Sequence, residues 1–159
     1  MHPMRRKDRE VRDPAHIREI LDKCTVCHIG LQDGDGVYIV PLNFGLVENN
    51  GQYRFYFHGD KQGRKMDLIG DGVKAGFQLE TGTELVPGQE AKDCTYKFQS
   101  IIGTGHIAPV LDKTEKIQAL DALMKQYRGE GDWTYPDRLI DLVGILRLDV
   151  EELSCKEYQ

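Results

Sequence analysis

Closely spaced turn signals between short alternating segments constrain the fold of this chain more than any other feature. Asp33-Gly34-Asp35-Gly36 and Asn49-Asn50-Gly51 have the composition of tight hairpin turns. The first turn separates predicted strands over residues 24–31 and 37–43, and the second precedes a predicted strand over residues 52–58. Hairpin turns join neighbouring antiparallel strands, so we expect a mainly β fold.

The second half of the sequence adds three further predicted strands. Residues 73–80 alternate apolar and polar side chains, and residues 94–110 form one long strand that we expect to bend at Gly103 and Gly105. The last predicted strand covers residues 142–153. Six strands joined largely by hairpins predict a six-stranded antiparallel β-barrel, because closing the sheet removes its exposed edges.

A few helices are predicted between these strands. Asp13-Pro14 combines an N-cap residue with a proline suited to the first helical turn. Residues 112–115 have the spacing of a capping box and begin the clearest helix, whose apolar side extends to Tyr127. We expect a short helical turn over residues 133–141 and a loop over residues 81–92.

Length and charge exclude several classes of protein. A chain of 159 residues can bury a substantial core, and we assign residues 1–159 to a single domain with a charged arm over residues 1–12. The net charge of −5 provides no general attraction to nucleic acid or to an anionic membrane. The arm lacks the apolar core of a secretory signal, and no apolar run approaches the about 20 residues of a membrane span. We therefore expect a cytoplasmic protein that binds neither nucleic acid nor membrane.

A basic corner that contains glycines follows the third predicted strand. The aromatic segment 53–58 ends at His58 and continues as Gly59-Asp60-Lys61-Gln62-Gly63-Arg64-Lys65. Glycines allow the backbone to approach a ligand closely, and Lys and Arg neutralise an anion. The residues after Gly63 can begin a helix, whose free N–H groups would add to an anion site. The corner is therefore predicted to hold a phosphate, although a solvated charged face is the alternative for its cations.

Pro41 indicates an opening in the predicted barrel. Proline cannot donate to a strand ladder, so within a strand it belongs at an edge, a bulge or an opening. A split in the barrel at Val40–Asn43 would leave backbone N–H and C=O groups available to a flat heterocycle. A phosphorylated, flat cofactor would satisfy both this opening and the basic corner.

The four cysteines allow several interpretations. Cys24-Thr25-Val26-Cys27-His28 matches the C-x-x-C-H pattern of haem c attachment, but that chemistry needs export and the sequence shows no export signal. In a predicted strand, Cys24 and Cys27 point to opposite faces, which suits neither a disulfide nor a shared metal ion. A zinc site would need a second ligand pair. We expect small buried thiols and no metal site.

Taken together, these segments resemble a known family. Val40-Pro41-Leu42-Asn43-Phe44-Gly45, Tyr56-Phe57-His58-Gly59 and Gly63-Arg64-Lys65 follow one another in the order typical of that family. They resemble the FMN-binding split barrels of the pyridoxamine 5′-phosphate oxidase superfamily, and are most similar to its nitroimidazole-resistance (Nim) group. The resemblance extends from Met4 to the final strand. It implies a split barrel and a homodimer with two FMN sites at the subunit interface.

The resemblance also implies where FMN would bind. Val40–Asn43 would lie along the flavin ring, and the corner from His58 to Lys65 would take the phosphate. Gln99 and Ser100 could reach the partner's flavin, as could Tyr96, and Trp133 could close over a cofactor; core packing is an equal alternative for all four. The predicted cofactor-binding residues are Val40, Pro41, Leu42, Asn43, Phe57, His58, Lys61, Gly63, Arg64, Lys65, Gln99, Ser100 and Trp133.

His58 is the one candidate for catalysis, and three roles stay open for it: contact with phosphate or flavin, proton transfer to a substrate, and capping of the strand. His16, His28 and His106 show no ligand spacing.

The expected function is that of an FMN-dependent oxidoreductase. Reduced FMN would transfer hydride or electrons to a small, flat, electron-poor acceptor such as a 5-nitroimidazole. True pyridoxamine 5′-phosphate oxidases end with an Arg-Leu-x-Pro segment, whereas this chain has Arg147-Leu148-Asp149-Val150, which argues against vitamin B6 oxidation. A flavin- or haem-binding module without turnover is the alternative, and some split barrels bind a deazaflavin. A flavin spectrum or a Soret band from the purified protein would distinguish them.

Overall fold

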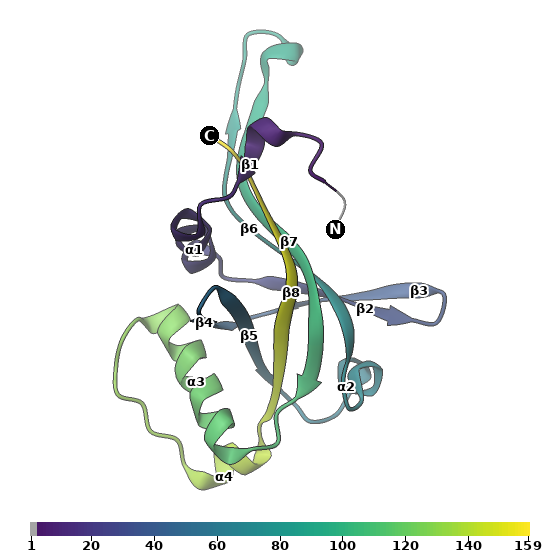
Figure 1. The fold of residues 1–159 in the computed structure, drawn as a ribbon, viewed down its shortest axis with the longest axis vertical. Helices are drawn as coiled ribbons and strands as arrows, with labels where there is room; N and C mark the ends of the chain where they lie inside the picture. Colours follow the sequence, from purple (N-terminus) through teal and green to yellow (C-terminus); the bar gives the residue numbers. More distant parts are fainter. Residues whose placement is uncertain (1–2) are drawn as a thin grey trace.

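The computed structural model describes residues 3–159 and is built around one antiparallel sheet (Figure 1). Its strands are β1 (Glu10–Val11), β2 (Cys27–Asp33), β3 (Gly36–Leu42), β4 (Gly45–Asn49), β5 (Gln52–Gly59), β6 (Val73–Val86), β7 (Thr95–Pro109) and β8 (Gly144–Tyr158). Its helices are α1 (Pro14–Lys23), α2 (Arg64–Ile69), α3 (Lys113–Arg128) and α4 (Asp137–Leu142), with 3-10 turns at Lys7–Arg9 and Ala91–Asp93.

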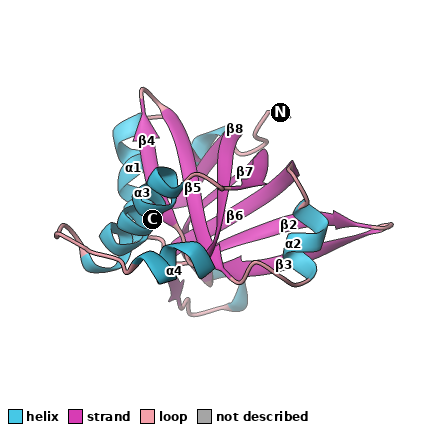
Figure 2. Ribbon diagram, turned by 90° about the horizontal axis from the view of Figure 1, so that it is seen from below, coloured by secondary structure: helices cyan, strands magenta, loops and turns pink. Residues whose placement is uncertain are grey.

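The strand order explains how the sheet forms a split barrel. The order is β3-β2-β6-β7-β8-β5-β4, and β1 pairs with β8. The sheet is strongly coiled, and the hairpin of β2 and β3 extends to the side of the molecule away from α3 (Figure 2). The two ends of this order, β3 and β4, are joined in the chain by residues 43–44 and do not pair with each other in the described sheet. The mainly β, antiparallel class predicted from the sequence is confirmed.

Two strands were not predicted, so the expected count of six is wrong. β4 occupies residues between the predicted strands 37–43 and 52–58 that were assigned to no strand, and it pairs with β5, from Gly45 opposite Tyr56 to Asn49 opposite Gln52. β1 belongs to the charged arm, which pairs with the end of β8 rather than extending freely. Residues 1 and 2 of that predicted arm lie outside the described residues.

The interior of the barrel is apolar and holds three interlocked aromatic rings. The ring centroids of Phe44 and Phe55 lie 5.4 Å apart, and those of Phe55 and Phe77 lie 5.3 Å apart, both in edge-on arrangements. Alternation along β5 sends Phe55 and Phe57 into this core and Tyr56 to the opposite face, where a second apolar cluster lies under α3. The core therefore fixes both β5, which carries the predicted corner, and α3.

α3 packs closely on β4 because Gly45 has no side chain. A Cβ atom at Gly45 would lie 2.5 Å from the backbone nitrogen of Leu123, so no other residue fits without displacing the helix. The predicted N-cap at Asp112 is confirmed, since its carboxylate accepts a hydrogen bond of 2.8 Å from the backbone of Glu115. The side chain of Glu115 accepts from Tyr56 and Arg147, so the second bond of a capping box is replaced by these contacts.

The hairpin of β6 and β7 is longer than predicted and rises beyond the rest of the barrel (Figure 1). Half of the predicted loop over residues 81–92 is strand, because residues up to Val86 pair with the start of β7 after a register shift between Thr81 and Glu84. The predicted bend in β7 coincides with a second register shift, between Thr104 and Gly105, in its pairing with β8.

No helix in residues 3–159 is both long enough and apolar enough to cross a membrane.

Candidate functional site

The predicted phosphate corner is the connection between β5 and α2. β5 ends at Gly59, and Gly63 precedes α2 with a φ angle of +111°, a backbone conformation that favours glycine. A Cβ atom at Gly59 would lie 3.3 Å from Nζ of Lys65, so this ammonium group lies directly over the Gly59 backbone. The structure therefore brings a cation next to a glycine at the end of β5, where β5 pairs with Gly144 of β8.

The three cations of the corner differ in the partners that they already have within the chain. The guanidinium of Arg64 donates to the carboxylate of Asp33, with Nε 2.8 Å from Oδ2, and lies 4.5 Å from the centroid of the Tyr38 ring. Lys61 donates to the carbonyl oxygen of Asp141. Lys65 is half-buried and has no acidic or hydrogen-bonding partner within residues 3–159. Arg64 is therefore paired with a carboxylate and Lys61 has used one of its three N–H donors, whereas Lys65 keeps both its charge and all its donors for an anion.

The opening predicted at Pro41 lies on the outermost strand of the sheet. β3 pairs with β2 alone in the described sheet, with Pro41 opposite His28 and Val40 opposite Ile29. Pro41 and Asn43 are exposed, whereas Val40 and Leu42 are half-buried. The outer edge of β3 thus presents backbone N–H and C=O groups that no strand occupies, as expected for a surface that binds a heterocycle.

A small cavity lies where the ends of β3 and β5 meet α3. Its volume is about 230 Å³, and its lining residues are Asn43, His58, Leu120, Leu123, Met124, Tyr127 and Tyr135. The imidazole of His58 is exposed and forms no hydrogen bond within the described residues. The cavity and the phosphate corner therefore adjoin, since His58 precedes Gly59 in the chain.

Tyr127 fixes the end of β3 against α3. Its hydroxyl donates to the carbonyl oxygen of Thr25 at 2.6 Å and accepts from the side-chain amide of Asn43 and the backbone N–H of Phe44, both at 3.1 Å. Asn43 also donates to the Thr25 carbonyl oxygen at 3.1 Å. These bonds orient the Asn43 side chain at the mouth of the cavity.

Sequence reasoning did not assign a role at the site to Tyr127 or to the other α3 residues of the cavity. Tyr127 was recognised as the end of an apolar helical face, but its contact with β3 spans 84 positions to Asn43. Tyr135 comes from the loop after α3, and its hydroxyl donates to Asp121 at 2.9 Å. Burial, followed by this hydrogen bond, raises the pKa of Tyr135 above its ordinary value. Only the fold brings these residues to the predicted segments.

Within one chain, the side chains of several predicted site residues do not reach the basic corner or the edge of β3. The side chain of Phe57 is 1% exposed and belongs to the core, so it offers a ligand only its backbone. Gln99 is buried on β7 and donates to Glu157 at 3.0 Å. Ser100 lines a separate cavity between β7, β8 and the N-terminal arm.

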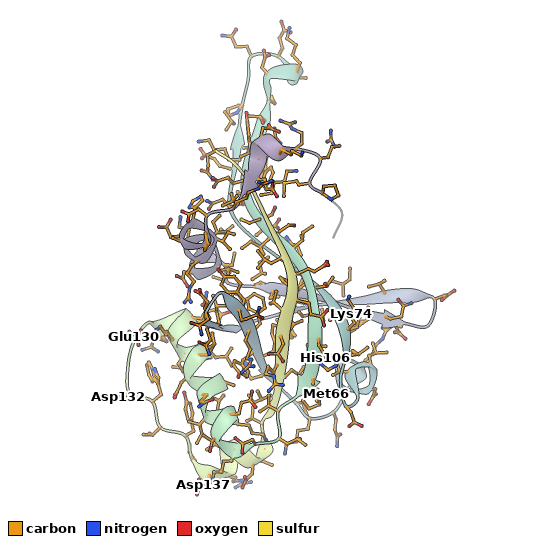
Figure 3. The ribbon with its side chains drawn as sticks, viewed as in Figure 1. Met66, Lys74, His106, Glu130, Asp132 and Asp137 are labelled. Atoms are coloured by element: carbon orange, nitrogen blue, oxygen red, sulfur yellow. The ribbon has the colours of Figure 1, made fainter. Side chains whose placement is uncertain are left out.

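Trp133 also lies apart from the basic corner. It belongs to the loop after α3 and stacks with Arg128, whose guanidinium carbon is 5.8 Å from the ring centroid. Glu130 and Asp132 mark this loop in Figure 3, on the opposite side of the molecule from Met66 of α2. Within one chain, Trp133 therefore cannot cover a ligand held at the α2 corner.

Cys24, Cys27 and Cys155 are buried, as expected, whereas Cys94 is exposed, and the geometric reason given for Cys24 and Cys27 is wrong. Cys24 lies at the C-cap of α1 and not in β2, because the strand begins only at Cys27. Burial raises the pKa of Cys24 to about 12 and that of Cys155 to about 11, and it raises the pKa of Cys27 as well. Within residues 3–159, no group of three or more His, Cys, Asp or Glu side chains is arranged to hold a metal ion.

An antiparallel split barrel with these features is the fold of flavin-binding proteins related to pyridoxamine 5′-phosphate oxidase. Residues 13–157 match the family described as pyridoxamine 5′-phosphate oxidase. The chain therefore belongs to this family. Comparison with curated proteins gives no match.

Solved structures support the same fold. A protein from Bacteroides thetaiotaomicron assigned to 5-nitroimidazole antibiotic resistance is 24% identical, with a TM-score of 0.79 over 93% of this chain and 86% of that one. A flavocytochrome from Azotobacter vinelandii is 20% identical, with a TM-score of 0.80 over 99% and 73% of the two chains. The FAD and heme binding protein from Mycobacterium smegmatis is 15% identical, with a TM-score of 0.82 over 95% and 74%. At these identities the likeness concerns the fold.

Proposed function

We propose that this protein binds FMN and, in the reduced state, transfers hydride or electrons to small electron-poor aromatics such as 5-nitroimidazoles. The observation that carries the proposal is the half-buried ammonium of Lys65, which has no partner in the described chain and lies over Gly59. A half-buried cation without an anion loses hydration and gains no partner, so it favours binding of a phosphate.

The residues present fit the parts of FMN in two places. Lys65 beside Gly59 suits the phosphate, and the unpaired edge of β3 from Val40 to Leu42 suits the polar rim of a flavin ring. Arg64 would contribute less than the sequence suggested, because Asp33 already neutralises it. The six residues of α2 form a helix too short for its dipole to add much, so the phosphate site depends on side-chain charge.

Bound FMN would supply the redox chemistry, and the protein would supply orientation and a proton. His58 is exposed at the cavity beside the corner and has no competing hydrogen bond in the described chain, so it can donate a proton to an acceptor that becomes more basic on reduction. Tyr127 holds Asn43 and the end of β3 in position for this contact.

The hydrogen bonds that Arg147 already makes argue against oxidation of pyridoxamine 5′-phosphate. This side chain donates to Glu115 and to Asp149, each at 2.9 Å, and the following residues continue β8 without the proline of true oxidases. A guanidinium already held by two carboxylates is poorly available to a substrate phosphate.

We further propose that the working unit is a homodimer with FMN between the chains. Gln99, Ser100 and Trp133, which lie away from the corner in one chain, would then approach the cofactor of the partner. Val37 and Ile39 support this arrangement, because each is 64% exposed on the face of β3 next to β2 and β6. An apolar sheet face of this kind favours association with another protein surface.

Anaerobic mixing of the reduced protein with 5-nitroimidazole tests the activity. We expect recovery of the oxidised flavin absorbance much faster than for free reduced FMN at the same acceptor concentration. Recovery at the rate of free FMN would contradict a reductase and leave a flavin-binding module. A Soret band in place of a flavin spectrum would instead favour haem, which the printed names of two structural neighbours associate with this fold.

A further inference from the structure

The cavity between α3 and the ends of β3 and β5 is lined mostly by aliphatic and aromatic side chains. Leu120, Leu123 and Met124 contribute aliphatic surface, and Tyr127 and Tyr135 contribute two aromatic rings. Such a wall favours a flat apolar or aromatic molecule, because burial of apolar area and contact between rings both stabilise it.

The polar groups of the two tyrosines are committed elsewhere. The hydroxyl of Tyr127 donates to Thr25 and accepts two hydrogen bonds, and the hydroxyl of Tyr135 donates to Asp121. A ligand in the cavity would therefore contact their rings and not their hydroxyl groups. The polar groups that remain for a ligand are the His58 imidazole and the Oδ1 atom of Asn43.

The lining contains no carboxylate, ammonium or guanidinium group. An ionised ligand would lose its hydration without gaining a charged partner, and that loss is costly. A neutral ligand with one hydrogen-bonding group directed at His58 meets no such penalty.

The volume of the cavity favours a small ligand. At about 230 Å³, the cavity lies below the roughly 300–1,000 Å³ of typical drug-sized sites. This volume suits one aromatic ring with a small substituent, and Leu120, Leu123, Met124 and Tyr127 of α3 form one wall of it.

We propose that this cavity is the acceptor pocket and that it selects neutral, planar, single-ring aromatics, with Leu120 and Met124 setting the size limit. The proposal rests on the proposed reductase function, because it assigns that reaction's acceptor to a place beside the FMN corner. It goes further by excluding anionic and fused-ring acceptors and by assigning selectivity to α3.

Equilibrium binding to the oxidised holo-protein tests the pocket without depending on turnover. Calorimetric titrations would use nitrobenzene, 4-nitrobenzoate and 1-nitronaphthalene as probes. Each carries one nitro group, and they differ in charge and in the number of rings. We expect nitrobenzene to bind, and the anionic and fused-ring probes to bind at least about tenfold more weakly, a difference of about 1.4 kcal/mol. Equal affinity for all three would overturn the selectivity.

Substitutions on α3 test whether nitrobenzene binds in this cavity. Met124→Trp fills the cavity and should weaken nitrobenzene binding at least about tenfold with unchanged FMN content. Gln118→Trp, at an exposed position of the same helix, is the matched control and should change neither. Thermal melting shows whether each variant is folded, and Leu120→Phe replaces Met124→Trp if the latter unfolds.

The outcomes separate the two proposals. Retained nitrobenzene affinity in a folded Met124→Trp protein would overturn the pocket, and so would loss of FMN, since the cavity would then hold the flavin itself. A wild type that binds FMN but not nitrobenzene would overturn the pocket and leave the proposed cofactor intact. A wild type without FMN would refute the proposed function, whereas nitrobenzene binding that Met124→Trp abolishes would still support the cavity.

Discussion

Lys65 and Arg64 are neighbours in sequence but differ in what their charges do. Asp33 holds Arg64, whereas Lys65 has no partner in the described chain. The sequence pattern Gly-Arg-Lys cannot reveal this difference, because Asp33 lies 31 positions before Arg64 and reaches it only through the fold. The structure therefore ranks two residues that the sequence treats alike.

The first prediction follows from this ranking. Lys65→Ala should weaken FMN binding by about ten- to a hundredfold, since a hydrogen bond to a charged group contributes about 1.5–3 kcal/mol. Arg64→Ala should have a smaller effect, and Lys74→Ala, which removes an exposed lysine 3.6 Å from Glu151, should have none. Fluorescence titration of flavin-free protein measures all three. Equal affinities for the Lys65→Ala variant and the wild type would remove Lys65 from the site.

The cysteines give a second prediction at the residue scale. Cys94 is exposed, whereas Cys24, Cys27 and Cys155 are buried with raised pKa values. In native protein at mildly alkaline pH, a thiol reagent should therefore modify Cys94 rapidly and the other three only on unfolding. Mass spectrometry counts the modified thiols, and Cys94→Ser should abolish the rapid phase. Rapid modification of Cys24 or Cys27 would contradict the burial described.

At the scale of elements, α1 is tied to β8 by a titratable pair. Nε2 of His16 lies 3.0 Å from Oε2 of Glu157, which also accepts from Gln99. Hydrogen bonds to Glu157 and Glu19 raise the pKa of His16 above 6.5, and hydrogen bonds from Gln99 and then His16 lower the pKa of Glu157 below 4.5.

The third prediction is the pH dependence of this tie. A raised histidine pKa stabilises the fold below pH 6.5 and ceases to do so as the pH rises through the folded value. A lowered carboxylate pKa stabilises it above pH 4.5 and ceases to do so as the pH falls. The melting temperature of wild type minus that of His16→Gln should therefore be largest between pH 4.5 and 6.5 and should decline at higher pH. A difference that grows with pH would contradict this linkage.

The elements that sequence reasoning predicted are those with strong local signals. Asp13 and Asp112 cap their helices as expected, and the Asn49-Asn50-Gly51 turn joins β4 to β5. The elements it missed depend on distant pairing. β1 exists because β8 offers an edge to residues 10–11, and the extension of β6 to Val86 depends on pairing with β7. Likewise, no local pattern indicates that Cys24 ends a helix and lies outside β2.

At the scale of the whole molecule, the exposed apolar face beside β2 and β6 supports the proposed dimer. The fourth prediction is that Ile39→Asp shifts the protein from dimer to monomer, because it places a charge on that face. FMN affinity should fall with it, since a site completed by two chains is linked to their association. Sedimentation of the holo-protein measures the first effect, and Lys74→Ala provides the control. An unchanged dimer would exclude this face as the interface.

The arrangement of the predicted site residues also concerns the whole molecule. The segments 40–43 and 58–65, which we propose to bind the flavin ring and the phosphate, are close in sequence and lie in one chain. Gln99, Ser100 and Trp133 lie too far from them in that chain to complete the same site. The α3 residues of the cavity carried ordinary helical periodicity and no chemical motif, so only their packing against β3 and β5 identifies them.

The central claim is that this chain binds FMN through its own corner between β5 and α2. Titration of FMN into flavin-free protein, followed by quenching of flavin fluorescence, tests it most directly. The account predicts saturable binding of one FMN per chain that Lys65→Ala weakens by about ten- to a hundredfold and Lys74→Ala leaves unchanged. Absence of saturable quenching, or quenching that Lys65→Ala does not alter, would contradict it.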